Sequence, residues 1–198
     1  MQDARTLQAY DDHAAAYSAD WLAQPAPDDL YALLTKHFIA GGRTADIGCG
    51  NGRDANWLAA HGFPVEGFDA SEALLAEARR LFPAIPFRHA LLPDLTGVTA
   101  PFDNIVCETV IMHLSPAAIP AALASLQRIL RPGGVIYLSW RATEGEDQRH
   151  ADGRLYAAFR PDLVRAAFAG WAILHDEDVT SLSSGKRICR LIARKPAA

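Results

Sequence analysis

The chain has 198 residues, of which 50% are apolar and 21% are charged. This balance is typical of a packed globular protein, and it excludes a disordered chain. The net charge of −4 argues against a general nucleic-acid binder. No apolar run approaches the ~18 residues that a membrane-spanning helix needs. We therefore expect one domain over residues 1–198, with no membrane partner.

The cysteines and the N-terminus bear on the compartment. Cys49, Cys107 and Cys189 lie far apart and form no C-x-x-C pair, which argues against a disulfide framework or a zinc knuckle. The first residues contain no basic region followed by an apolar core, so no secretory signal is expected. Both features favour a cytoplasmic protein.

The first forty residues are predicted to form a helical cap. Tyr10, Tyr17 and Trp21 recur at helical spacing within a helix expected over residues 3–21. A second helix is expected over residues 28–39, after a proline-containing break. The aromatic stripe has two interpretations: it packs onto the core, or it covers a ligand site and offers ring faces to a cation.

From residue 41 onward, short apolar runs alternate with helical patterns. Strands are predicted over residues 44–47, 65–68, 85–90, 104–107 and 135–140, and helices over 53–61, 71–81, 115–130 and 161–169. A turn is expected at 131–134 and irregular chain over 143–153. This alternation predicts an α/β core over residues 41–198, built on a doubly wound, mostly parallel sheet.

The end of the chain breaks the alternation. Residues 171–180 and 186–194 form two strand-like runs, joined by 181–185 with no helix between them. We therefore expect an antiparallel hairpin at the edge of the sheet. The five basic residues after position 185 either guard this edge strand with positive charge or form a patch for an anionic partner.

A glycine loop follows the first predicted strand. In Asp46-Ile-Gly-Cys-Gly-Asn-Gly52, three glycines occupy alternate positions before a helix. Such glycines either pack a tight strand–helix turn or let a ligand approach the backbone. The dinucleotide fingerprint would place its third glycine at the position of Arg53. Asp46 would repel a pyrophosphate but suits an ammonium group, so the loop favours S-adenosylmethionine over NAD.

A second acid follows the second predicted strand. Asp69 lies 23 residues after Asp46 and would reach the same edge of the sheet. A carboxylate there can accept hydrogen bonds from both ribose hydroxyls of a nucleoside. The alternative is an acid that only stabilises the start of the following helix, which Ser71 is expected to cap.

These segments resemble the class I S-adenosylmethionine-dependent methyltransferases. The resemblance rests on the glycine loop, on Phe68-Asp-Ala-Ser71, on Phe102-Asp103, on Leu130-Arg-Pro-Gly-Gly134 and on the terminal hairpin. Other stretches, such as Leu191-Ile-Ala-Arg-Lys195, are similar to tellurite-resistance and thiopurine-type methyltransferases. The resemblance implies a Rossmann-like sheet of seven strands with helices on both faces, and S-adenosylmethionine as cofactor, with S-adenosylhomocysteine as product.

The resemblance also implies which residues hold the cofactor. Asp46 and the glycine loop would surround the methionine part, Asp69 the ribose, and Ala70 and Leu74 the adenine. The family often has an acid after the third strand; this chain has Leu91 and Leu92 there, so backbone groups would serve instead. The expected cofactor-binding set is Tyr17, Asp46, Gly48, Cys49, Gly50, Asn51, Arg53, Asp69, Ala70, Leu74, Leu91, Leu92, Glu108 and Thr109.

Two residues near the fourth predicted strand are candidate catalytic groups. Glu108 is either a solvent-facing acid at the strand end or a base in the crevice. His113 is either a packing residue among apolar neighbours or a wall of the methyl-transfer site. Residues expected to line the acceptor pocket are Trp140, Arg141, Arg154 and Tyr156. The seven histidines show no metal-binding spacing, so no metal is expected.

The predicted function is methyl transfer to a small-molecule acceptor, which a sulfur or chalcogen nucleophile would suit because it needs little base assistance. Two alternatives remain open: a module that binds the cofactor without turnover, and a nicotinamide-dependent oxidoreductase on a related fold. A monomer or a homodimer is expected, with no nucleic-acid partner.

Overall fold

The computed structural model describes residues 3–99, 101–143, 145–180 and 185–197. Its centre is a seven-stranded sheet with the strand order β3-β2-β1-β4-β5-β9-β8. The strands are β1 (Thr44–Ile47), β2 (Val65–Asp69), β3 (Phe87–His89), β4 (Phe102–Cys107), β5 (Leu130–Arg141), β8 (Ala172–Thr180) and β9 (Arg187–Arg194).

The topology confirms the predicted doubly wound sheet. Strands β1 to β5 pair in parallel, and the order reverses between β1 and β4. Strand β9 runs antiparallel between β5 and β8. Ligands of open α/β sheets bind outside the carboxyl ends of the strands near such a reversal. The reversal therefore marks the edge at which to look for a site.

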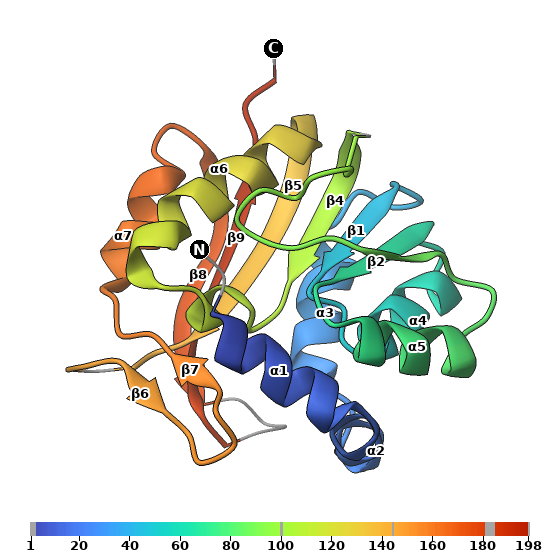
Figure 1. The fold of residues 1–198 in the computed structure, drawn as a ribbon. Coiled ribbons are helices and arrows are strands. Elements are labelled where there is room, and N and C mark those ends of the chain that lie inside the picture. The colour runs from blue at the N-terminus through green and yellow to red at the C-terminus, as the bar shows by residue number, and fades with distance from the viewer. Residues whose placement is uncertain (1–2, 100, 144, 181–184, 198) are drawn as a thin grey trace.

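Helices cover both faces of the sheet (Figure 1). On one face, α6 (Ile119–Ile129) and α7 (Pro161–Ala167) bury apolar side chains such as Leu123 and Val164. On the other face, α3 (Asp28–His37), α4 (Arg53–Ala60) and α5 (Glu72–Leu81) contribute Leu34, Leu58 and Leu75 to a second core. Helix α5 is capped by Ser71, whose side chain accepts a bond from the Leu74 N–H, as predicted.

The N-terminal cap corrects one prediction. The single helix expected over residues 3–21 is wrong, because His13 has non-helical backbone angles and separates α1 (Ala4–Asp12) from α2 (Ala14–Ala23). Both short helices contact α5, which the break allows because it changes the direction of the chain between them. They lie below the sheet in the view of Figure 1, with α1 between β7 and α2.

Two further segments differ from expectation. The turn expected at 131–134 lies inside β5, where the ladder to β4 shifts register between Phe102 and Asn104. The segment expected to be irregular, 143–153, contains β6 (Gln148–Arg149), which pairs with β7 (Leu155–Tyr156) just after it in a second, two-stranded sheet. Smaller elements are the 3-10 turns η1 (Ile111–His113) and η2 (Pro116–Ala118).

The predicted connection at 181–185 lies mostly outside the described residues. In the parts of the chain that the structure describes, no helix combines the length and apolar character needed to cross a membrane.

Candidate active site

A cavity of about 430 Å³ opens at the carboxyl ends of the parallel strands. Its walls come from α1 and α2, the glycine loop after β1, the end of β2, the segment after β4, and the chain between β5 and β9. Segments far apart in the sequence therefore meet at one place, at the sheet edge that the strand order marks.

The glycine loop takes backbone conformations that favour glycine. Gly48 and Gly50 have φ angles of 75° and 55°. A Cβ on Gly48 would lie 2.3 Å from the side chain of Val110, and one on Gly50 would lie 2.9 Å from the Trp21 ring. The missing side chain at Gly50 thus lets α2 approach the loop and form the roof of the cavity. Gly52 instead makes room for the Phe87 ring, since its Cβ would lie 2.6 Å from that ring.

Asp46 is a buried acid without a full set of partners. Its side chain is 3% exposed, and the Oδ2 atom has no hydrogen-bond partner among the described residues. Burial raises the pKa of this carboxyl well above its usual value, and the nearby acids Asp54 and Asp69 add to the effect. An unpaired buried carboxylate is costly, and a cationic group of a ligand would remove that cost.

Asp69 at the end of β2 holds the loop in place. Its Oδ2 accepts the Gly50 N–H at 2.8 Å, and its Oδ1 accepts the Ser71 N–H at 2.9 Å. The Asp11 carboxylate of α1 accepts the Ser71 hydroxyl at 2.5 Å, so the cap joins the same network. A carboxylate has about four acceptor positions, so Asp69 retains capacity for further donors.

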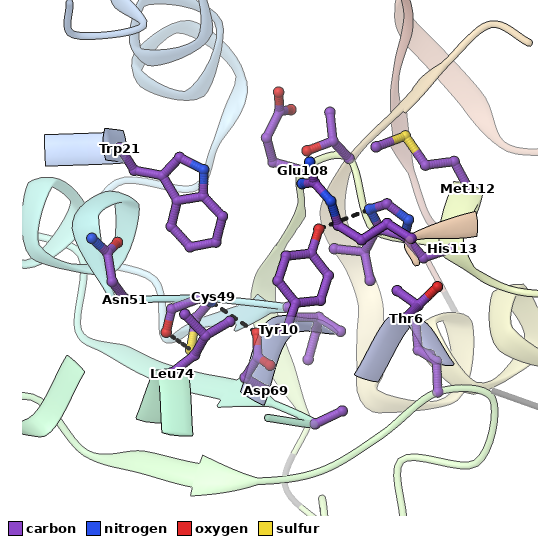
Figure 2. A pocket seen from close by; sticks show the side chains of 18 of the residues that line it. Thr6, Tyr10, Trp21, Cys49, Asn51, Asp69, Leu74, Glu108, Met112 and His113 are labelled. Carbon is purple, nitrogen blue, oxygen red and sulfur yellow. Dashed lines mark hydrogen bonds between the residues drawn. The ribbon is translucent and has the colours of Figure 1, made fainter. Parts of the chain in front are cut away.

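His113 is hydrogen-bonded at both ring nitrogens. The Leu155 carbonyl lies 2.6 Å from Nδ1, so Nδ1 carries the proton. Nε2 then accepts the Tyr10 hydroxyl at 3.0 Å, a contact that Figure 2 shows across the cavity. Burial lowers the pKa of His113 to about 4. The imidazole is therefore neutral at pH 7, and it joins the cap to the β6–β7 segment.

Glu108 is also engaged. Its Oε2 accepts the Tyr137 hydroxyl at 2.7 Å and the Ser139 hydroxyl. Ser139 in turn accepts the N–H of Thr109, a residue with a φ of 55°. Burial raises the pKa of Glu108, while the two hydroxyls oppose the shift. Glu108 thus faces the cavity as a held carboxyl rather than as the solvent-facing acid of the alternative interpretation.

The opposite end of the cavity is basic. Arg141 lies over the Tyr156 ring at 4.7 Å, and its Nη1 is 3.4 Å from Nε2 of His150. Arg154 pairs with Asp152 at 2.8 Å and lies 4.8 Å from the Tyr17 ring centre. The β5–β7 segment therefore gathers positive charge opposite the acids of the loop.

The structure gathers nearly all the predicted site residues around this cavity. Tyr17 does not line it; its ring stacks on Trp21 and its hydroxyl donates to Asp152 at 3.0 Å. Arg53 lines the cavity and binds Asp54 and the Trp21 carbonyl. Trp140 is buried in the core instead of lining the cavity. The predicted residues that line it are Asp46, Gly48, Cys49, Gly50, Asn51, Arg53, Asp69, Ala70, Leu74, Leu91, Leu92, Glu108, Thr109, His113, Arg141, Arg154 and Tyr156.

Several lining residues were not assigned to the site from sequence. Thr6, Leu7 and Gln24 come from the cap, whose placement over the sheet edge has no local signal. Lys186 and Ile188 come from the terminal hairpin, where Ile188 pairs with Arg141. The remaining members of this group are Ile47, Asp54, Ala90, Val110, Met112, Leu114 and His150.

Comparison with known proteins agrees with this geometry. Residues 45–134 match a family model described as a methyltransferase domain. A trans-aconitate 2-methyltransferase of Acidovorax sp. is 38% identical over 140 residues, which cover 67% of this chain and 52% of the relative. The chain spans about half the length of the curated relatives it matches.

Two solved structures share the fold. The 1,6-didemethyltoxoflavin-N1-methyltransferase of Burkholderia thailandensis, solved with S-adenosylhomocysteine, superposes with a TM-score of 0.77 at 23% identity, over 98% of this chain and 88% of that one. TehB of Haemophilus influenzae gives a TM-score of 0.67 at 18% identity, over 85% of this chain and 62% of that one. Together, the methyltransferase domain matched over residues 45–134 and the shared sheet topology show that the chain has the class I methyltransferase fold.

Proposed function

We propose that this protein transfers a methyl group from S-adenosylmethionine to a small-molecule acceptor. The observation that carries the proposal is the unpaired, buried Oδ2 atom of Asp46 beneath the glycine loop. A ligand that brings an ammonium to this atom would remove the cost of an uncompensated buried carboxylate. The α-amino group of S-adenosylmethionine is such a group, whereas a dinucleotide would bring phosphates.

The other lining residues fit the rest of the cofactor. Asp69 keeps acceptor positions for the ribose hydroxyls while it orders the loop. Leu74, Leu91 and Leu92 provide an apolar wall suited to the adenine ring. When bound, the cofactor supplies a methyl group activated by a positively charged sulfur.

The chain's own contribution is alignment and exclusion of water rather than proton transfer. His113 has both nitrogens hydrogen-bonded, and Oε2 of Glu108 accepts hydrogen bonds from two hydroxyls. Nε2 of His113 and Oε2 of Glu108 are therefore not free to take a proton from an acceptor in this arrangement. This favours an acceptor atom that arrives already anionic, such as a sulfur or chalcogen nucleophile, as the sequence suggests. The acceptors named for a relative and for a structural neighbour are small molecules, which supports a small-molecule acceptor but not its sulfur or chalcogen character.

The test is a binding titration with two ligands that differ only in the amino-acid part. Asp46→Asn is expected to weaken S-adenosylhomocysteine binding about tenfold or more, since it removes a charge-assisted contact. The same variant should bind 5′-methylthioadenosine, which lacks the ammonium, as the wild type does. Equal loss for both ligands, or protection of the protein by NAD but not by S-adenosylhomocysteine, would overturn the proposal. Transfer of a labelled methyl group then separates an enzyme from a binding module.

A further inference from the structure

The cavity has opposite charge at its two ends. The acids Asp46 and Asp69 belong to β1 and to the end of β2, and Asp54, which binds Arg53, and Glu108 follow β1 and β4. The bases Arg141, His150 and Arg154 come from the end of β5 and from the chain that follows it. Tyr156 is the centre of the basic end, since its ring contacts Arg141 at 4.7 Å, His150 at 4.2 Å and Arg154 at 5.8 Å. The acidic end is the part that the proposed function gives to the cofactor. The basic end is therefore left for the acceptor.

The charges at the basic end are not equally balanced. Arg154 is neutralised by Asp152, which binds it at 2.9 Å and 2.8 Å. Arg141 has no carboxylate oxygen within 4.0 Å among the described residues; its guanidinium lies on a ring face and next to His150. Burial and the Arg141 charge both lower the pKa of His150, so this imidazole is neutral at pH 7 and does not change the charge next to Arg141. One cation at the cavity wall thus lacks an anionic partner in the described chain.

We infer that Arg141 binds a carboxylate group of the methyl acceptor. A guanidinium presents a planar pair of donors that matches the two oxygens of a carboxylate. The Tyr156 ring supports the Arg141 guanidinium at 4.7 Å, and the neutral His150 beside it does not neutralise the positive charge of Arg141. The backbone N–H of Arg141 is 3.1 Å from Sδ of Met112, so the main chain of Arg141 is held beside another residue that lines the cavity. This inference rests on the proposed function and names the class of acceptor.

The experiment measures binding and turnover in two steps. Saturating S-adenosylhomocysteine is added first, and its effect on the melting temperature reports the proposed function alone. A panel of short mono-, di- and tricarboxylic acids, thiol-bearing acids among them, is then added, each with its neutral amide and its phosphate-bearing counterpart. We expect at least one acid to raise the melting temperature further and to be methylated in the presence of S-adenosylmethionine, while its amide is inactive.

Arg141→Gln should raise KM for that acid about ten- to a hundredfold and abolish the preference for acid over amide. Arg141→Lys, which keeps the charge but loses the fork, should recover part of the preference. Arg160→Gln is the matched control, because Arg160 is exposed and paired with Asp162 outside the cavity. An intact response of Arg141→Gln to S-adenosylhomocysteine shows that it folds.

Three results would overturn the inference while leaving the cofactor site standing. These are amides that bind as well as acids, phosphate compounds that bind better than every acid, and a shift with S-adenosylhomocysteine to which no acid adds. Failure of S-adenosylhomocysteine itself to bind would instead remove the proposed function.

Discussion

Two kinds of residue shape this site: glycines, whose lack of a side chain leaves room for neighbours, and polar residues whose side chains are fixed by hydrogen bonds. At Gly50 the absent side chain leaves room for the Trp21 ring, so the cap can close over the loop. Both ring nitrogens of His113 and Oε2 of Glu108 form hydrogen bonds with neighbouring residues. Oδ2 of Asp46, in contrast, is buried and has no hydrogen-bond partner among the described residues.

Substitution of Gly50 separates backbone strain from crowding. Gly50→Ala and Gly62→Ala both place a side chain at positive φ, at 55° and 83°, which costs about 1–2 kcal/mol each. Only the first meets a ring, because a Cβ on Gly62 has nothing within 4 Å. We expect Gly62→Ala to lose stability through backbone strain alone in urea unfolding, and Gly50→Ala to lose more stability and also S-adenosylhomocysteine affinity. Unchanged affinity in that variant would show that the cap does not need Trp21 on the loop.

His113 predicts how stability depends on pH. Its pKa is about 4 in the folded chain against 6.5 in the unfolded one, so the unfolded chain takes up the proton first. The folded state is therefore fully stable above pH 6.5 and loses up to about 3 kcal/mol as the pH falls toward 4. Urea unfolding at several pH values should show a shallower fall for His113→Gln.

His61→Gln, at an exposed position, is the control and should keep the wild-type dependence. An identical fall in all three proteins would contradict the assignment of this loss to the buried imidazole.

At the scale of elements, the cap and the β6–β7 sheet hold each other. Asp3 pairs with Arg149 at 2.8 Å, and the Thr6 hydroxyl accepts the Leu155 N–H at 2.8 Å. Neither β6 nor β7 exceeds two residues, so these contacts with α1 supply order that such short strands lack alone. The cover of the cavity is thus assembled from two segments that are distant in sequence.

Thr6→Val tests this mutual support. The substitution keeps the shape of the side chain but leaves the Leu155 N–H without its acceptor, at a cost of about 1–3 kcal/mol. Hydrogen exchange should show faster exchange at Leu155 and along α1. Thr35→Val removes a hydroxyl that donates to the Tyr31 carbonyl within its own helix, and should leave both segments protected. Equal exchange rates in wild type and Thr6→Val would mean that the two segments are ordered independently.

Local sequence patterns account for the elements of the main sheet. The alternation of apolar runs and helical stretches predicts β1 to β5 and the terminal hairpin, because each is stabilised by its own periodicity. The break at His13 lets α1 and α2 both pack against α5, and the β6–β7 pair is stabilised by α1. Both features depend on contacts between distant segments, so no local sequence pattern predicts them. Long-range contacts also explain why the expected turn at 131–134 is part of β5.

At the scale of the whole molecule, the strand order brings residues that are distant in sequence together at one site. The reversal between β1 and β4 brings Asp46, Asp69 and Glu108 to one edge of the sheet. This grouping can be predicted from sequence, because all three residues lie at or near the carboxyl ends of predicted strands. The sequence does not predict which acidic side chain pairs with each basic side chain of the cavity. That Asp152 neutralises Arg154, whereas Arg141 has no such partner in the described chain, depends on how the β5–β7 segment folds back. The division of the cavity into an acidic and a basic end is therefore a property of the folded chain.

The most direct test of this account is a crystal structure with S-adenosylhomocysteine. We predict that its amino group lies within hydrogen-bond distance of Oδ2 of Asp46, that its ribose hydroxyls meet Asp69, and that the space beyond its sulfur ends at Arg141. A nucleoside bound elsewhere, or a cavity that stays without ligand at saturating concentration, would contradict the account.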